Sequence, residues 1–146
     1  MAQFQFSLDK VLRWRTLELA RQEAVLQRVL QEHRRLEAAA RTVAAERSQL
    51  TSSLGGLPDL SGSDLRATAA YSLRLWHKAD KIGQLLARSA RDLMVQQKKY
   101  SEAKLRLRLL EELKARQLKR WEYDQARQLE TLAAESHLAV WNRKEE

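Results

Sequence analysis

The 146-residue chain has no cysteine, a single proline and only four glycines. Without cysteine it forms neither a disulfide nor a thiolate-bound metal site, and it suits a reducing cytoplasm. Proline and glycine are the residues that most often interrupt helices and strands. Their scarcity, in a sequence rich in Ala, Leu, Arg, Glu, Gln and Lys, predicts an all-α chain made of long helices.

Long apolar runs and aromatic side chains are also scarce. The sequence has no stretch of about 18 apolar residues, the length that spans a membrane. Charges stand at Asp9, Lys10, Arg13 and Arg15, where a secretory signal needs an apolar core. We therefore expect a cytoplasmic protein that is not inserted directly into a membrane. With 32% charged residues and two Phe, it can bury a thin seam between paired helices rather than a thick core.

The first predicted helix covers residues 7–53. Ser7 is a suitable N-cap, and Asp9 favours the positive end of the helix. The apolar residues repeat in heptads, the pattern of a helix that packs against another helix, at Leu8, Leu12, Leu19, Leu26, Val29, Leu36, Ala40, Val43 and Leu50. Polar residues interrupt this seam at Arg15, Gln22, His33 and Arg47. Such residues either fix the register or mark a coil that bends or opens.

Residues 54–63 hold the only proline and three of the four glycines, and they predict a turn. Ser61 followed by Asp64, or Ser63 alone, can cap a second helix over residues 64–141. The sequence then predicts a single domain, residues 1–146, that is a long two-helix antiparallel coiled coil. In an alternative, the second helix ends near Gly83 and the rest of the chain returns as a third helix in a short bundle.

The second predicted helix is much longer than the first, so its last part has no partner within the chain. Pairing ends near Leu110 in this interpretation. Four apolar residues beyond that point stay on one stripe of the helix: Leu118, Trp121, Leu129 and Leu132. We therefore expect an overhanging C-terminal helix whose uncovered stripe binds another protein.

Residue patterns typical of enzymes and of cofactor sites are missing. The glycine-rich turn lacks the Lys-Ser/Thr pair of a phosphate-binding loop, and no strand precedes it. The histidines, His33, His77 and His137, have no partner one helical turn away that would complete a metal site. Glu111 and Glu112 are adjacent, so they lie on different faces of a helix. We predict no enzymatic activity, no cofactor and no metal site.

Basic residues are concentrated between residues 88 and 120, where eleven Lys or Arg face four acids, and the whole chain carries a net charge of +8. In one interpretation Glu102 pairs with Arg106, Glu112 pairs with Arg116, and the remainder is a solvated face. In another, this face meets acidic protein loops or a phosphate backbone, as in a basic helical hairpin that binds nucleic acid or the ribosome. The run has no interleaved aromatic residues, which argues against single-strand recognition.

Both ends of the sequence resemble a known family. The segment Phe6-Ser-Leu8-Asp-Lys-Val11-Leu12-Arg-Trp-Arg15 is similar to the Phe-x-Leu-x-x-Val-Leu-x-x-Arg start of the flagellar export protein FliJ and its relatives in type III secretion. The segment Leu110-Glu-Glu-Leu113-Lys-Ala-Arg116 resembles the Leu-Glu-x-Leu-x-x-Arg stretch of that family. The resemblance covers essentially the whole chain, although Ala133-Ala134-Glu135 stands where the family tends to carry Leu-Asp-Glu.

The resemblance implies a fold, a function and partners for bacterial flagellum biogenesis and motility. The family is a two-helix coiled coil, similar to the paired helices of the rotary ATP synthase gamma subunit. It acts as a regulatory stalk in the central opening of the hexameric export ATPase FliI, contacts the export gate protein FlhA and binds export chaperones. This places the protein in the cytoplasm, peripheral to the inner membrane at the flagellar export apparatus, with no nucleic acid as a partner.

Residue roles follow from the same resemblance together with the uncovered stripe. The residues expected to contact the ATPase are Leu8, Val11, Leu12, Arg15, Leu110, Leu113, Arg116, Leu118, Trp121, Leu129 and Leu132. The residues expected to contact the gate or a chaperone lie near the turn and are Leu54, Leu57 and Tyr71.

Overall fold

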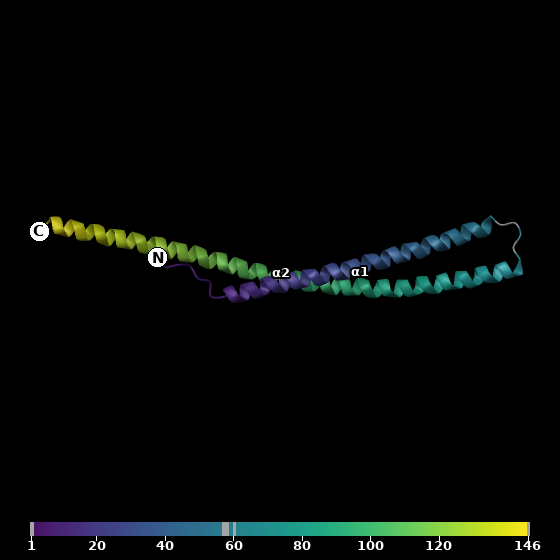
Figure 1. The fold of residues 1–146 in the computed structure, drawn as a ribbon. Coiled ribbons are helices and arrows are strands. Elements are labelled where there is room, and N and C mark those ends of the chain that lie inside the picture. The colour runs from purple at the N-terminus through teal and green to yellow at the C-terminus, as the bar shows by residue number, and fades with distance from the viewer. Residues whose placement is uncertain (1, 57–58, 60, 146) are drawn as a thin grey trace. The chain divides into compact units, whose positions relative to one another are not determined.

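Two long helices account for nearly all of the chain in the computed structural model, which describes residues 2–56, 59 and 61–145. Helix α1 spans Asp9–Gly55 and helix α2 spans Gly62–Lys144, and the described residues contain no strand. The two helices are packed against each other (Figure 1). The prediction of an all-α chain with two packed helices is confirmed, while Leu57 lies outside the described residues.

Helix α1 begins at Asp9, two residues later than Ser7 would place it. The backbone carbonyl of Leu8 accepts the amide of Leu12 at 2.9 Å, so Leu8 occupies the N-cap position. The predicted N-cap, Ser7, is therefore wrong. Asp9 does lie in the first turn, where its charge favours the positive end of the helix.

Helix α2 begins with the predicted pairing of Ser61 and Asp64. The amide of Asp64 donates to Ser61 Oγ at 3.2 Å, and the amide of Ser61 donates to Asp64 Oδ2 at 3.4 Å. This reciprocal arrangement satisfies two amides that the first turn of a helix leaves unpaired. The helix then continues through Gly83 without interruption, so the alternative with a third helix is not the structure observed.

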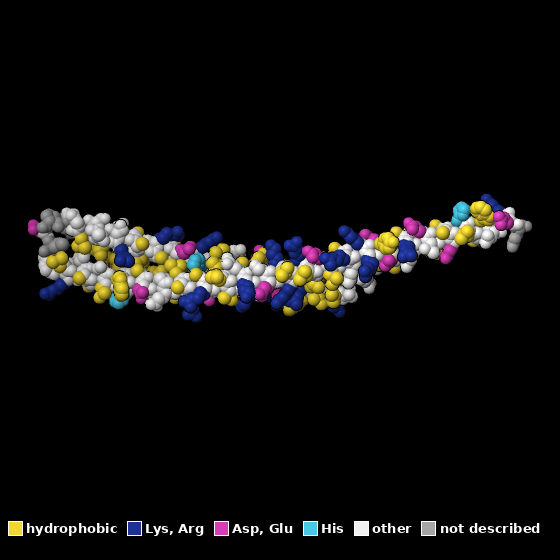
Figure 2. All heavy atoms as spheres, turned by 180° about the vertical axis from the view of Figure 1, so that it is seen from behind, with side chains coloured by type: hydrophobic (Ala, Val, Ile, Leu, Met, Phe, Trp, Pro, Cys, Tyr) yellow, Lys and Arg dark blue, Asp and Glu magenta, His cyan; other side chains and the backbone are white. Residues whose placement is uncertain are grey.

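The chain divides into two compact units, which we describe separately. One comprises Ala20–Ser101, and the other comprises the described residues of Met1–Leu19 and Glu102–Glu146. In the Ala20–Ser101 unit, hydrophobic side chains fill the space between the helices (Figure 2). Its most buried side chains, Val43 at 2% exposure and Leu75 at 3%, are accompanied by buried Ser89 and Gln96. The α2 positions 75, 89 and 96 are separated by multiples of seven, as the heptad pattern requires.

Two of the four polar residues in the α1 seam have partners on α2. Gln22 accepts a hydrogen bond from the side-chain amide of Gln96, and His33 Nδ1 lies 3.1 Å from Ser89 Oγ. Arg15 pairs instead with Glu18 of its own helix at 2.8 Å. Arg47, the fourth, is exposed.

Candidate protein-interaction surface

The unit formed by the two ends of the chain contains both segments that resemble the export family. From the first segment, Leu8 and Val11 are 37% and 39% exposed, and Leu12 is half-buried. From the second, Leu113 is 37% exposed, Leu110 is half-buried and Arg116 is exposed. The guanidinium of Arg15 lies 4.6 Å from the ring centroid of Trp14. The fold thus gathers the two segments into one unit with several apolar side chains accessible.

Residues 2–7 precede α1 and belong to neither a helix nor a strand, and we call them the N-terminal strap. Glutamine and phenylalanine alternate here, at Gln3, Phe4, Gln5 and Phe6. Phe6 is buried at 7% exposure and Phe4 is half-buried, whereas both glutamines are exposed. Burial of one such ring contributes about 1.5–3 kcal/mol.

The strap lies along α2, as Figure 1 shows for the purple start of the chain. The ring of Phe4 packs on that of Trp121, with centroids 6.0 Å apart and planes tilted by 54°. The ammonium of Lys114 is 6.0 Å from the centroid of the Phe6 ring and 3.5 Å from Asp9 Oδ1. Both members of this ion pair are partly solvated, so the pair contributes less than about 1 kcal/mol to the free energy of unfolding. The aromatic rings are therefore the main attachment of the strap.

This arrangement corrects the expectation that the stripe is uncovered from Leu118 onward. Leu118 and Trp121 are both half-buried. Helix α1, which packs on α2, begins only at Asp9. The strap that precedes it continues beside α2 as far as Trp121. The physical reason is that the aromatic rings of a short segment that is not helical can still cover part of a helix face.

Residues 122–144 are the last part of α2, which we call the tip. All of its described side chains except Gln125 are exposed. The predicted contact residues Leu129 and Leu132 are 65% and 61% exposed. Four further large apolar side chains are also accessible: Tyr123, Leu138, Val140 and Trp141. In Figure 2 hydrophobic side chains are spaced along this single helix among charged ones.

The exposed apolar side chains of the tip surround the helix axis. At about 100° per residue, Leu129 and Val140 point in nearly the same direction, and Leu138 points to the opposite side. Tyr123 and Trp141 lie about 120° from Leu129. Sequence reasoning missed Tyr123, Leu138 and Trp141 because it followed a single stripe, and it also left out Val140, which lies on that stripe. A search for apolar residues on every face of the unpaired helix would have found them.

Charge changes sign along the part of α2 that belongs to this unit. Residues 102–120 carry seven Lys or Arg and three Glu, whereas residues 122–145 carry three Lys or Arg and five acids. Glu112 pairs with Arg108 at 3.2 Å instead of with the predicted Arg116. Apart from Lys114, the basic residues between 88 and 120 are exposed. The basic face is thus available to solvent or to an acidic partner.

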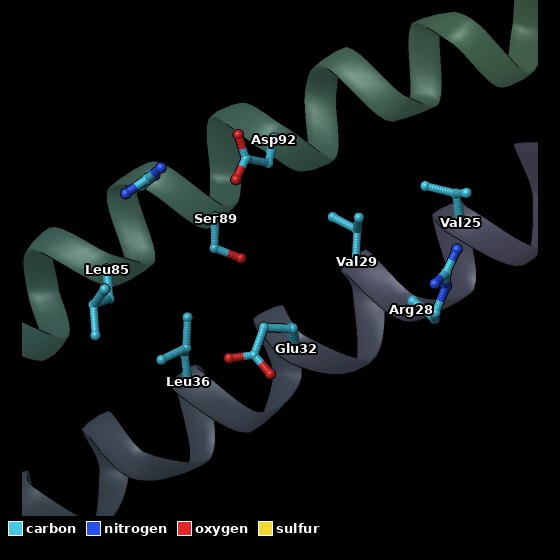
Figure 3. Close-up of a pocket in the computed structure, with 9 residues that line it drawn as sticks. Val25, Arg28, Val29, Glu32, Leu36, Leu85, Ser89 and Asp92 are labelled. Atoms are coloured by element: carbon cyan, nitrogen blue, oxygen red, sulfur yellow. The ribbon is translucent and has the colours of Figure 1, made fainter.

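The Ala20–Ser101 unit carries a groove of about 580 Å³ between its helices (Figure 3). Val25, Val29 and Leu36 from α1 and Leu85 from α2 supply its apolar wall. Two basic and two acidic side chains also line it: Arg28, Glu32, Arg88 and Asp92. Figure 3 shows the labelled side chains distributed along the groove, and they do not converge on one point. We therefore find no constellation suited to acid–base chemistry there.

Residues near the turn form a smaller surface in the same unit. Leu54 is half-buried and Tyr71 is 43% exposed. A groove of about 410 Å³ lies here, lined by Leu50, Ser53, Leu54, Asp59, Asp64, Ala67 and Thr68. Leu54 thus borders a concave surface, while Leu57 falls outside the described residues.

No group of three or more His, Asp or Glu side chains among the described residues is arranged to hold a metal ion. Within the part of the chain that the structure describes, no helix has the length and apolar character needed to cross a membrane. Comparisons with protein-family models, with curated proteins and with solved structures gave no match for this chain.

Proposed function

We propose that the chain is a stalk protein of flagellar type III export that binds the hexameric export ATPase FliI through its tip. In this proposal the two helices form one antiparallel coiled coil, and the end of α2 overhangs it. The protein has no enzymatic activity and no cofactor of its own. It acts by promoting the assembly and the activity of the ATPase, in the cytoplasm at the inner-membrane export apparatus.

The observation that carries this proposal is the distribution of apolar side chains around the tip. A helix that docks in a groove needs one apolar face, with anchors one turn apart. The tip instead exposes Leu129, Leu138 and Trp141 in three different directions. Helices that are apolar on all sides are normally surrounded by protein. A ring of subunits with a central opening offers such surroundings to a single helix.

Promotion of assembly follows from the same geometry. A helix inside a ring contacts several subunits at once, so it binds the assembled hexamer better than a single subunit. Any ligand that prefers one state shifts the equilibrium toward that state. The two segments that resemble the export family support this assignment, because Val11 and Leu113 are both accessible in the unit that carries the tip.

The other proposed partners are the export gate protein FlhA and the export chaperones. The surface near the turn is our candidate for them, with Leu54 beside a groove and Tyr71 partly exposed. Leu57 belongs to this proposal by its position in the sequence. Substitution of Tyr71 by Ala should weaken binding to the gate or to a chaperone and leave binding to the ATPase unchanged.

A matched pair of double variants tests the tip. Leu129→Ser with Leu138→Ser changes two tip residues, and Leu105→Ser with Leu109→Ser changes two leucines of α2, each 56% exposed, outside the tip. Burial of one leucine at an interface contributes about 1.5–3 kcal/mol, so the tip variant should bind the hexameric ATPase at least about tenfold more weakly. The control should bind normally. Equal ATPase binding and stimulation by both variants would exclude the tip as the contact.

A second candidate function, binding to nucleic acid or to the ribosome, is favoured by one observation. Ten of the eleven basic residues between 88 and 120 are exposed. Such binding would weaken steeply with salt, with a slope of about −0.9 per neutralised phosphate on duplex DNA. Titration of the protein with duplex DNA and with RNA at two salt concentrations separates this function from the stalk.

A further inference from the structure

The N-terminal strap occupies a face of α2 that the proposed ATPase contact also uses. Leu118 and Trp121 belong to that contact, and Phe4 of the strap packs directly on Trp121. We propose that the strap is a displaceable cover, which leaves this face before the ATPase binds it. The inference rests on the proposed function for the identity of the partner. It adds a conformational step that precedes binding.

The contacts that hold the strap explain why it can leave. Among the described residues, no hydrogen bond joins residues 2–5 to α2, and the attachments are the two rings and Lys114. Opening therefore breaks no backbone ladder. It exposes Phe4 and Phe6 but restores the conformational freedom of several ordered residues, which opposes the loss of ring burial. The strap can open while α1 and α2 stay folded.

The position of the strap explains what its departure changes. Helix α1 begins at Asp9, which pairs with Lys114, so the cover on Trp121 comes from the strap. With the strap open, Trp121 becomes accessible together with the exposed apolar side chains of the tip. With the strap closed, the free protein presents a smaller apolar surface, which limits unwanted association. The strap thus protects a binding face in the free protein.

The fluorescence of Trp121 tests whether the strap covers it. Trp14, Trp76 and Trp141 are each more than half exposed, so replacement of all three by Phe leaves the core intact and Trp121 as the only reporter. In that background Phe4→Ala with Phe6→Ala is compared with Gln3→Ala with Gln5→Ala, which changes exposed strap residues. Helicity is measured by circular dichroism for both.

A strap that covers Trp121 predicts a specific change in the fluorescence of that residue. Loss of the two rings should shift Trp121 emission to the red and raise its quenching by acrylamide to the value of a protein that retains Trp141 alone. The glutamine variant should match the parent. Unchanged emission and quenching in the phenylalanine variant would overturn the cover. A change of the same size in the glutamine variant would overturn the role of the rings.

Binding to the hexameric ATPase tests displacement, with both strap variants in the native tryptophan background. A strap closed nine-tenths of the time should make the native protein bind about tenfold more weakly than the phenylalanine variant. If the native protein binds the ATPase and the phenylalanine variant binds it equally or more weakly, the displacement of the strap is overturned. The proposed function is not affected by that result. If none of the three proteins binds, the proposed function fails and displacement by the ATPase fails with it, while the quenching result still decides whether the strap covers Trp121.

Discussion

The side-chain amide of Gln96 donates to Gln22 twice, to its side-chain oxygen at 2.7 Å and to its backbone carbonyl at 3.2 Å. Gln96 is 7% exposed, so it lies in the seam where a coiled coil normally places leucine. A polar pair at such a position stabilises one register over its neighbours, because a shift along the helix leaves both amides without partners.

Replacement of both seam glutamines by leucine should therefore raise the stability of the fold, and it should make the register of the two helices less specific. We expect Gln22→Leu with Gln96→Leu to raise the free energy of unfolding, and Gln96→Ala alone to lower it by about 1 kcal/mol. Denaturation followed by circular dichroism measures both changes. Gln97→Leu alters an exposed neighbour and serves as the control. A double leucine variant less stable than the parent would contradict the prediction.

Val43 provides a test of the packed seam in the Ala20–Ser101 unit. It is 2% exposed, and its replacement by Ala removes buried carbon atoms and leaves a cavity. We expect Val43→Ala to lower the free energy of unfolding by about 2 kcal/mol. Val95, which is 55% exposed, gives a matched control, and Val95→Ala should change stability by less than about 0.5 kcal/mol. Equal losses in the two variants would argue against the seam as described.

The cap at the start of α2 can be tested by Ser61→Ala. This change removes the oxygen that accepts the Asp64 amide, so we expect a loss of about 1 kcal/mol and faster hydrogen exchange in the first turn. Ser72→Ala, at an exposed position within the helix, should be neutral or slightly stabilising. Unaltered exchange at the first turn after Ser61→Ala would show that the cap contributes nothing.

The contact between Asp9 and Lys114 should matter little. Its length of 3.5 Å and the partial exposure of both side chains predict that Lys114→Met costs less than about 1 kcal/mol. The difference should shrink in about 1 M salt, where the Debye length is about 3 Å. A larger, salt-independent loss would indicate that the contact of the Lys114 ammonium with the Phe6 ring is the main effect.

The heptad repeat of apolar residues and the positions of glycine and of the capping residues were sufficient to predict much of the fold. The heptads that contain Val43 and the scarcity of glycine predict long packed helices, and the serine at position 61 followed by Asp64 predicts the start of α2. These signals are local, so a sequence shows them directly. The polar residues Gln22 and His33 were recognised in the seam. Their partners, Gln96 and Ser89, depend on the register, which no local pattern determines.

The strap could not be predicted in the same way. The alternation of Phe4 and Phe6 with glutamine is too short to indicate a strand, and the packing of Phe4 on Trp121 joins opposite ends of the sequence. Contacts of this kind depend on the folded arrangement of helices that must form first. The same reason explains why Trp121 was expected to be bare. Leu129 and Leu132, which the strap does not reach, are exposed as expected.

The tip has a consequence for the lifetime of the protein in a cell. It is about 34 Å of helix whose described side chains are almost all exposed, so it gains little of the stability that tertiary packing gives to helices. When such a helix frays, side chains such as Tyr123 and Leu138 become cleavage sites for proteases. The partner proposed above would protect the copies that it holds, because degradation follows the population of the open form. Turnover of unassembled copies would then match the amount of this protein to the amount of its partner.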